Sequence, residues 1–405
     1  MNLVSFLGMF LIFAFAVLLL SHDGKLNSTK NIVTCTGLLM AAVMLRLYWF
    51  DWVTLDYKDF LSPWIEYFRN NGGFKALGTP IGNYNVPYLY FLAAFSYFDV
   101  DGMYLIKLLS VTFDVILAYS MMKLVSLYTR NEWQQLAAFF GILFLPTVVL
   151  NGSTWAQCDS IYAAFAVLGI WLALDDRPVV SMICFTLSFA FKLQAVFVLP
   201  IIAVLWFMKK FKFWHFFIFP AAYVVIVLPA VLMGRPFWDT VTLYFSQTGS
   251  IGSGLNYNSS SIFALFPNDA NAEFWSKGGV IMAFTYMLTL LLLAWKNRRD
   301  LNYTMCYAIL LLFAVGIPFL LPHMHDRYFF CADVLAVGFA AIFPAMLAIP
   351  VLVQFASLLG YHAYLKMRYL LPMADGAMAL IAVLTVLLIF FICQLPAVNA
   401  RRFRK

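Results

Sequence analysis

The segment 51–90 concentrates acidic and aromatic side chains in a chain that is otherwise dominated by apolar runs. Its carboxylates are Asp51, Asp56, Asp59 and Glu66. A carboxylate near a bound substrate can act as the general base that removes a proton from an attacking hydroxyl group. Asp56 and Asp59 are therefore candidates for such a base, with a solvated surface acid as the alternative for each.

Two further polar groups stand where the chain is apolar. The stretch 155–162, WAQCDSIY, opens an apolar run, and capping of exposed backbone amides is one explanation for Asp159. Lys192 lies within the apolar stretch 178–208, where insertion of a lysine at mid-helix costs about 2.5–3.5 kcal/mol. We expect Lys192 either to reach the outer membrane interface or to bind a phosphate group.

The turn 322–328, PHMHDRY, is the densest polar cluster in the second half of the chain. Its two histidines could ligate a metal together with Asp326, whereas their rings would diverge if the segment were helical. Binding of a phosphate or a sugar is the interpretation that we favour for this turn.

The composition indicates a polytopic membrane protein. Of the 405 residues, 64% are hydrophobic and 11% are charged, against about a quarter charged in soluble domains. The net charge of +7 is better explained by topology than by a nucleic-acid partner, because the basic residues cluster at short loops. The six cysteines show neither a C-x-x-C motif nor a disulfide framework, so they indicate no zinc or redox site.

The lengths of the apolar runs predict an all-α bundle of about 11–13 transmembrane helices, forming a single integral-membrane domain over residues 1–405. Lys192 marks either a tight turn between two short helices or a charge within one tilted helix. Two amphipathic stretches, Pro63–Asn70 and Val86–Phe98, are too short to span and are expected to lie along the membrane interface. The expected helices lie near 3–20, 32–50, 103–126, 133–150, 156–174, 178–191, 193–208, 214–233, 279–295, 302–320, 328–344, 346–361 and 376–394.

The distribution of lysine and arginine predicts the orientation of the bundle. Short basic loops and the basic C-terminus are expected in the cytoplasm, by the positive-inside rule. The first long loop (51–102) and the second (234–278) then lie on the extracytoplasmic side, together with the turn around 321–327. Arg235 begins the second loop, and pairing with Asp239 is one explanation for it.

Taken together and in order, these polar segments resemble motifs of the GT-C superfamily of glycosyltransferases, which use a polyprenyl-phosphate sugar. The similarity is to the glucosyltransferases of N-glycan assembly and to bacterial proteins grouped with the second mannosyltransferase of GPI-anchor synthesis. It covers residues 51–330 and rests on six stretches, Asp56-Tyr57 with Trp64 and Glu66, Tyr84-Asn85-Val86-Pro87, Trp155-Ala-Gln157 to Ser160, Phe191-Lys192 with Pro200, Arg235 with Asp239, and His323-Met-His325-Asp326-Arg327.

The chain departs from the family pattern in three places. The first loop is one residue longer, so that Asp59 or Asp51 could take the position of Asp56. The Tyr-Asn-Val-Pro stretch lacks the first proline of the family's pair, and Asp326 replaces a glutamate. Bacterial members tolerate such variants, which favours a bacterial protein.

The resemblance implies an inverting hexosyltransferase in the bacterial plasma membrane, with its active site facing outward. It would move one hexose of the glucose or mannose class from a polyprenyl-phosphate donor to a hydroxyl of a glycan or glycolipid acceptor. The lipid tail of the donor would lie in a groove that opens to the outer leaflet and its lipids. Since cations of the protein can stabilise the departing phosphate, no divalent metal or other cofactor is expected.

The resemblance also implies a role for each candidate site residue. Asp56 would be the general base, with Asp59 as the second choice. The donor phosphate would be bound by Lys192, Arg327, His323, His325 and Arg235, and the acceptor or sugar by Trp64, Tyr84, Gln157, Asp159 and Asp326.

Two other classes of protein fit a polytopic chain. A transporter or a flippase of lipid-linked sugars is the main alternative, but transporters concentrate polar groups near the bilayer midplane and often show repeats. Here the polar groups fall on outer loops, and no repeat is apparent. The other alternative, a non-catalytic subunit of an envelope-assembly complex, predicts that Asp56 can be replaced without loss of activity.

Overall fold

The computed structural model describes residues 3–247, 254–267 and 271–395. Within these ranges the protein is a helical bundle, and its strands are the short segments β1 (Asn256–Tyr257) and β2 (Met324–His325), which pair in parallel. The predicted class, an all-α polytopic membrane protein, is confirmed.

Eight helical segments of the described chain are long and apolar enough to cross a membrane. A ninth candidate span consists of α6 (Glu132–Leu143) and the segment Pro146–Thr154, which bends by 43° where Pro146 interrupts the helix. The eight are α1 (Leu3–His22), α2 (Thr29–Trp49), α5 (Gly102–Ser126), η5 with α11 (Phe213–Leu232), α14 (Ala272–Lys296), α15 (Tyr303–Leu320), η7 with α17 (Pro344–Lys366) and α18 (Met373–Gln394).

Shorter apolar helices complete the bundle. They are α4 (Val86–Phe95), α8 (Asp159–Leu174), α9 (Pro178–Phe191) and α16 (Phe330–Ile342), and most of their residues are buried within the protein. The described chain thus has eight or nine candidate spans, fewer than the predicted 11–13 transmembrane helices, because α8, α9 and α16 fall on apolar runs that were expected to span. The predicted helix 193–208 is divided into a 3₁₀ turn, η4 (Leu193–Phe197), and α10 (Ile201–Phe207).

Lys192 lies at a break between helices. Its backbone is extended (φ −155°, ψ 134°), so α9 ends at Phe191 and η4 begins directly after the lysine. The tight turn is therefore the correct one of the two expected arrangements.

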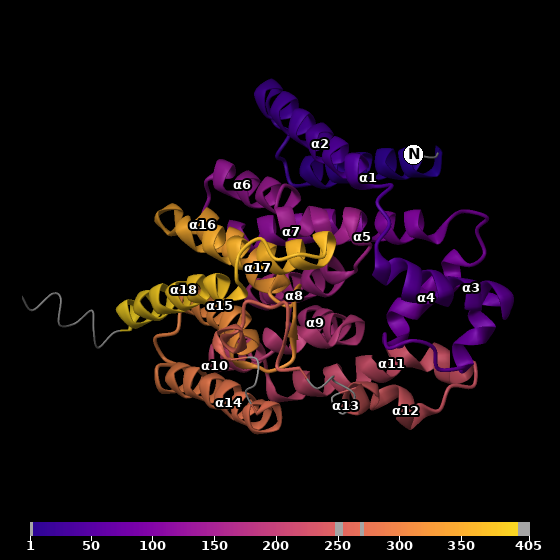
Figure 1. Ribbon diagram of the computed structural model, residues 1–405. Helices are drawn as coiled ribbons and strands as arrows, with labels where there is room; N and C mark the ends of the chain where they lie inside the picture. Colours follow the sequence, from indigo (N-terminus) through magenta and orange to yellow (C-terminus); the bar gives the residue numbers. More distant parts are fainter. Residues whose placement is uncertain (1–2, 248–253, 268–270, 396–405) are drawn as a thin grey trace, which may run out of the picture.

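The first long loop folds into four short helices. They are the π-helix η1 (Tyr57–Leu61), α3 (Ser62–Asn70), the 3₁₀ helix η2 (Gly73–Gly78) and α4 (Val86–Phe95). Both predicted stretches are thus helical, but α4 ends at Phe95 and is apolar and covered by protein along its length, so it is not amphipathic as predicted. Pro63 and Pro87 stand in the first turns of α3 and α4, where proline is tolerated. Figure 1 shows α3 and α4 at one end of the bundle and the C-terminal end of α18 at the opposite end.

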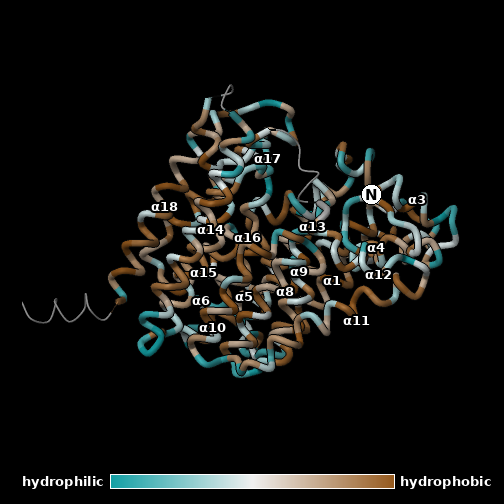
Figure 2. The backbone as a smooth tube through the Cα atoms, turned by 90° about the horizontal axis from the view of Figure 1, so that it is seen from below, coloured by the Kyte–Doolittle hydropathy of each residue, from teal (hydrophilic) through white to brown (hydrophobic). Residues whose placement is uncertain are grey.

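The helices differ in how much of their surface the protein covers. About four-fifths of the apolar window of α15 is buried, whereas less than a third is buried in α1, α2 and α14. Hydrophobic segments make up the bundle, and hydrophilic segments gather in the connections at its periphery (Figure 2). A helix that is apolar on all sides and poorly covered by protein is typical of one that faces lipid.

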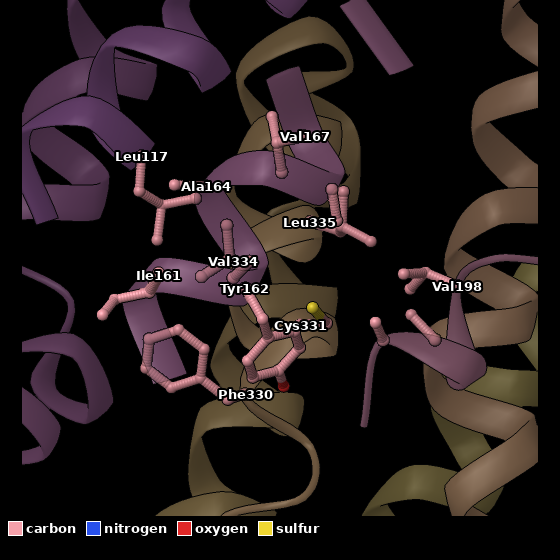
Figure 3. Close-up of a cluster of buried hydrophobic side chains, with 14 of the residues drawn as sticks. Leu117, Ile161, Tyr162, Ala164, Val167, Val198, Phe330, Cys331, Val334 and Leu335 are labelled. Atoms are coloured by element: carbon pink, nitrogen blue, oxygen red, sulfur yellow. The ribbon is translucent and has the colours of Figure 1, made fainter. Parts of the chain in front are cut away.

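Part of the hydrophobic core joins α8 to α16. Figure 3 shows Ile161 and Tyr162 of α8 beside Phe330, Cys331 and Val334 of α16, and all five are buried. Since α8 begins at Asp159 and α16 begins at Phe330, this packing brings the polar stretch before α8 against the turn before α16.

A buried ion pair ties this region to the N-terminal helices. Arg46 of α2 donates from Nε and Nη2 to Oδ2 of Asp114 of α5, at 3.1 and 2.9 Å. The other oxygen of Asp114 accepts a hydrogen bond from Ser160 near the start of α8. Because an unpaired buried charge is costly, this contact favours one fixed arrangement of α2, α5 and α8.

Candidate active site

Charged residues from distant segments meet at one place. The guanidinium of Arg327 lies among three carboxylates, with Nη1 3.6 Å from Asp56 Oδ2, Nε 3.6 Å from Asp159 Oδ2, and Nη1 3.7 Å from Asp326 Oδ1. Lys192 pairs directly with the other oxygen of Asp159. The cluster therefore combines residues of the first loop, the start of α8, the end of α9 and the turn before α16.

Asp56 is held by two donors from the stretch before α8. Trp155 Nε1 and Gln157 Nε2 donate to Asp56 Oδ2 at 2.8 and 2.9 Å. The residue between them, Ala156, has φ of 62°, in the left-handed region that costs a residue with a Cβ atom about 1–2 kcal/mol. This conformation turns the side chains on both sides of Ala156 toward the same carboxylate.

Tyr364 at the end of α17 supports the same carboxylate from another direction. Its hydroxyl accepts a hydrogen bond from the Asp56 backbone amide at 3.0 Å, and its ring stacks on Trp155 at 3.9 Å and 7°. Tyr364 was not predicted from the sequence, because it lies 308 residues from Asp56 and follows an apolar run that was expected to end at residue 361.

Lys192 and Asp159 form a buried pair. Asp159 Oδ2 also accepts from Asn151 Nδ2 at 2.6 Å, and Lys192 Nζ lies 5.8 Å from the centre of the Tyr84 ring. The α8 N-terminus has no side-chain cap, and the Asp159 carboxylate instead binds Lys192. The Lys192 side chain is buried within the protein.

The cations face a cavity of about 1040 Å³. Tyr84, Lys192, His323, His325 and Arg327 line its polar part. Much of the remaining wall is apolar, formed by Phe191, Leu193, Val196, Phe197, Val280, Ile281 and Leu321. Because Val280 and Ile281 of α14 are 52% and 65% exposed, this apolar wall continues onto the outer surface of the bundle. A groove of this kind suits an anionic head group that carries a hydrocarbon tail.

The two histidines are held separately beside this cavity. His323 Nδ1 lies 2.6 Å from the carbonyl oxygen of Gly254, and its Nε2 lies 3.0 Å from Ser276 Oγ. His325 stacks on Tyr257, its partner in the β ladder, with ring centres 4.7 Å apart. Burial, and then the nearby charge of Arg327, lower the pKa of His325 to about 4, so its ring is neutral at physiological pH.

Asp326 is buried at the base of the same turn, and its Oδ1 has no hydrogen-bond partner in the described structure. Burial raises the pKa of Asp326 to about 7, against the opposing effect of Arg327. No group of three histidine, cysteine, aspartate or glutamate residues in the described ranges is arranged to hold a metal ion.

Trp64 and Tyr84 extend the contacts of Asp56 into the first loop. The Tyr84 hydroxyl donates to Gln157 Oε1 at 3.0 Å, and Trp64 packs edge-on against the Tyr84 ring at 5.6 Å. Trp64 does not line the cavity. It therefore lies behind Tyr84, where it can position the ring but not touch a ligand in that cavity.

Three predicted candidates lie apart from the cluster. Asp59 is exposed on η1, and Asp51 is exposed and accepts a hydrogen bond from Tyr104. Arg235 is buried after α11, does not line the cavity, and forms no ion pair within the described part of the chain. Among the three aspartates considered for the base, Asp56 alone contacts the cluster.

A comparison with known families places part of this site in context. Residues 94–208 match the family model described as alpha-(1->6)-mannopyranosyltransferase, N-terminal domain. The match supports glycosyltransferase activity. It confirms the predicted class of enzyme and spans Trp155, Gln157, Asp159 and Lys192, but neither Asp56 nor the turn before α16. No curated protein matches the chain.

Proposed function

We propose that this glycosyltransferase is an inverting mannosyltransferase of the GT-C type, which transfers one mannose from a polyprenyl-phosphate donor to a hydroxyl of a glycan or glycolipid. The observation that carries the proposal is the position of Arg327, within 3.6 Å of Asp56 and on the wall of a cavity with an apolar side. A candidate base thus stands directly beside a candidate phosphate site.

The chemistry follows from this placement. The acceptor oxygen attacks the anomeric carbon while Asp56 takes its proton. The bond from that carbon to the phosphate oxygen breaks on the opposite face, and its electron pair leaves with the polyprenyl phosphate. Lys192 and Arg327 stabilise the charge on the departing phosphate, and the anomeric configuration inverts.

The charge balance of the cluster suits an incoming phosphate. With Asp326 in its neutral form, two carboxylates face two cations. A phosphate can then attract Arg327, whose Nε has no hydrogen-bond partner in the described structure and whose carboxylate neighbours lie beyond hydrogen-bonding distance. His323 and His325 add contacts for the phosphate, and the neutral ring of His325 adds no charge to the cluster.

The match to a mannosyltransferase family favours mannose over glucose as the transferred hexose. The basic loops favour an active site on the outer face of a bacterial plasma membrane and a cytoplasmic C-terminus. In the structure, α3 and α4 lie at the opposite end of the bundle from the end of α18, which accords with this orientation (Figure 1).

A transfer assay tests the proposal. The purified protein is given radiolabelled polyprenyl-phosphate mannose, polyprenyl-phosphate glucose or GDP-mannose, with a mannoside acceptor. We expect product from polyprenyl-phosphate mannose alone. Product from GDP-mannose would overturn the lipid donor, and movement of the lipid-linked sugar across vesicles without any transfer would indicate a flippase.

A further inference from the structure

A second cavity, of about 640 Å³, lies on the other side of the β ladder. It is lined by residues of β1, of η6 (Ile262–Leu265) and of the connection between α17 and α18. We propose that this cavity is a subsite for an uncharged glycan acceptor, holding the sugar units behind the one whose hydroxyl is attacked. The inference rests on the proposed transfer reaction and specifies where its second substrate lies.

The lining has the chemistry of a sugar site. None of its residues is charged, in contrast to the cations of the first cavity, so it does not suit a phosphate. Tyr369 presents a ring that is 63% exposed, and Phe263 and Phe266 add aromatic surface. Aromatic faces with a few fixed amide groups give a pocket both the apolar area and the hydrogen-bonding groups that a sugar ring requires.

Asn258 is the amide that is available to a ligand. Its Oδ1 accepts a hydrogen bond from the Tyr369 hydroxyl, whereas its Nδ2 donates no hydrogen bond to any residue that the structure describes. Asn256 is different, because both ends of its amide bind the backbone of Ser259. Asn258 has φ of 56°, a conformation that asparagine tolerates better than most residues.

Residues close in sequence to both walls of the second cavity contact the candidate active site. Tyr257 stands between the two asparagines and, because side chains alternate along a strand, faces the other way, onto His325 of the first cavity. Tyr364, which precedes Tyr369 of the opposite wall by five residues but does not line the cavity itself, contacts Asp56. Asp56 lines neither cavity, but it lies 3.6 Å from Arg327 of the first cavity, and its backbone binds Tyr364, which is close in sequence to Tyr369 of the second.

Two glycines fix the shape of this cavity. A Cβ atom at Gly360 of α17 would lie 2.6 Å from the carbonyl oxygen of Asn258 and 2.8 Å from that of Asp326. At Gly376 of α18 it would lie 2.8 Å from Cβ of Ser260. The segment after β1 is therefore seated directly against α17 and α18, and a preformed site of this kind loses little entropy when it binds a flexible glycan.

The test compares acceptors of different length in variants of the second cavity. Tyr369→Ala removes the ring, and Asn258→Gly removes the amide while keeping the left-handed backbone accessible. For an α-linked mannotriose acceptor we expect KM to rise at least tenfold in each variant, with little change for a simple methyl mannoside. KM for polyprenyl-phosphate mannose and the rate of its hydrolysis by water should remain as in the unmodified protein.

Phe98→Ala is the matched control, since Phe98 is an exposed aromatic residue of the first loop that lines neither cavity. Unchanged KM for mannotriose in both variants overturns the subsite. Saturation-transfer NMR measures the binding of mannotriose in the absence of donor, and this measurement separates the two proposals. Binding that is lost in Tyr369→Ala supports the subsite even if no donor is turned over, which would overturn only the transfer reaction.

Discussion

The Nη1 atom of Arg327 lies 3.6 Å from Oδ2 of Asp56, and no hydrogen bond joins them. That oxygen already accepts hydrogen bonds from Trp155 and Gln157, which accounts for a distance to Arg327 beyond that of a hydrogen bond. Arg327 is therefore attracted to the carboxylate by charge while its donors remain available to another anion.

Replacing Asp56 tests the base directly. In Asp56→Asn the amide oxygen can still accept from Trp155 and Gln157, but the side chain cannot take a proton. We expect kcat to fall by at least about a hundredfold, the lower end of the contribution of a general base. The melting temperature and KM for the donor should change little.

Asp59→Asn is the control for that variant, because Asp59 is an exposed carboxylate close by in sequence. It should retain nearly full turnover. Full activity in Asp56→Asn, or loss of activity in Asp59→Asn alone, would move the base to another residue.

The pair of Lys192 and Asp159 allows stability to be separated from donor binding. Lys192→Met leaves the Asp159 carboxylate buried without its ammonium partner, at a cost of up to about 3 kcal/mol in the free energy of unfolding. The double variant Lys192→Met with Asp159→Asn removes both charges and should recover most of this loss.

KM for the donor should nevertheless stay raised at least tenfold in both variants, because each lacks the cation. Thermal unfolding in detergent and donor titration measure the two effects. If the double variant regains ordinary donor KM, then Lys192 serves stability and not phosphate binding.

The left-handed backbone at Ala156 predicts an unusual response to glycine. Ala156→Gly should leave the melting temperature within a degree or two, because relief of strain offsets the added freedom of the unfolded chain. Ala163→Gly, at a buried position in the interior of α8, should instead lose about 1 kcal/mol. Equal destabilisation by the two substitutions would contradict the role of backbone strain at residue 156.

The buried carboxyl of Asp326 predicts that stability falls as pH rises. Its pKa of about 7 in the folded protein exceeds the ordinary value near 4, so the folded state binds more protons between these limits. This contribution is complete below about pH 4, decreases by at most about 1.4 kcal/mol per pH unit, and is gone above about pH 7. Asp326→Asn should remove this part of the slope, as measured by thermal unfolding of both proteins from pH 4 to 8.

Divalent metal is not required by the proposed chemistry, in which Lys192 and Arg327 meet the phosphate. Transfer should therefore persist in EDTA. Two results together would instead indicate a metal site at the two histidines. EDTA would inhibit transfer and added Mg²⁺ or Mn²⁺ would restore it, and His323→Ala would remove this response to EDTA and metal.

The sequence was sufficient for the helices but not for their contacts. The length of apolar runs located most helices but overcounted the spans, because the buried helices α8, α9 and α16 are as apolar as a span and too short to be one. Lys192 was expected either at a turn between two helices or as a charge within one, and the structure shows the turn. The Arg46–Asp114 pair and Tyr364 were missed, because each acts through a partner far away in the chain and lies in an apolar helix that offers no local signal.

The charged cluster was predicted in part, whereas the roles of its residues stay predictions. The motifs indicated Asp56, Lys192 and Arg327, which the structure brings together through Asp159. Arg235 belonged to an equally weak motif, yet it lies apart, because spacing along the chain carries no information on which loop ends converge. Tyr257 gave no signal, since its contact with His325 depends on the register of the two short strands.

The positive φ at Ala156 also offers a criterion for recognising distant relatives. A protein that presents an aromatic residue and a glutamine to one carboxylate in this way needs, between them, a residue that accepts this conformation. Glycine, asparagine, aspartate or alanine is then expected at that position and a β-branched residue is not, however far the remaining sequence has diverged.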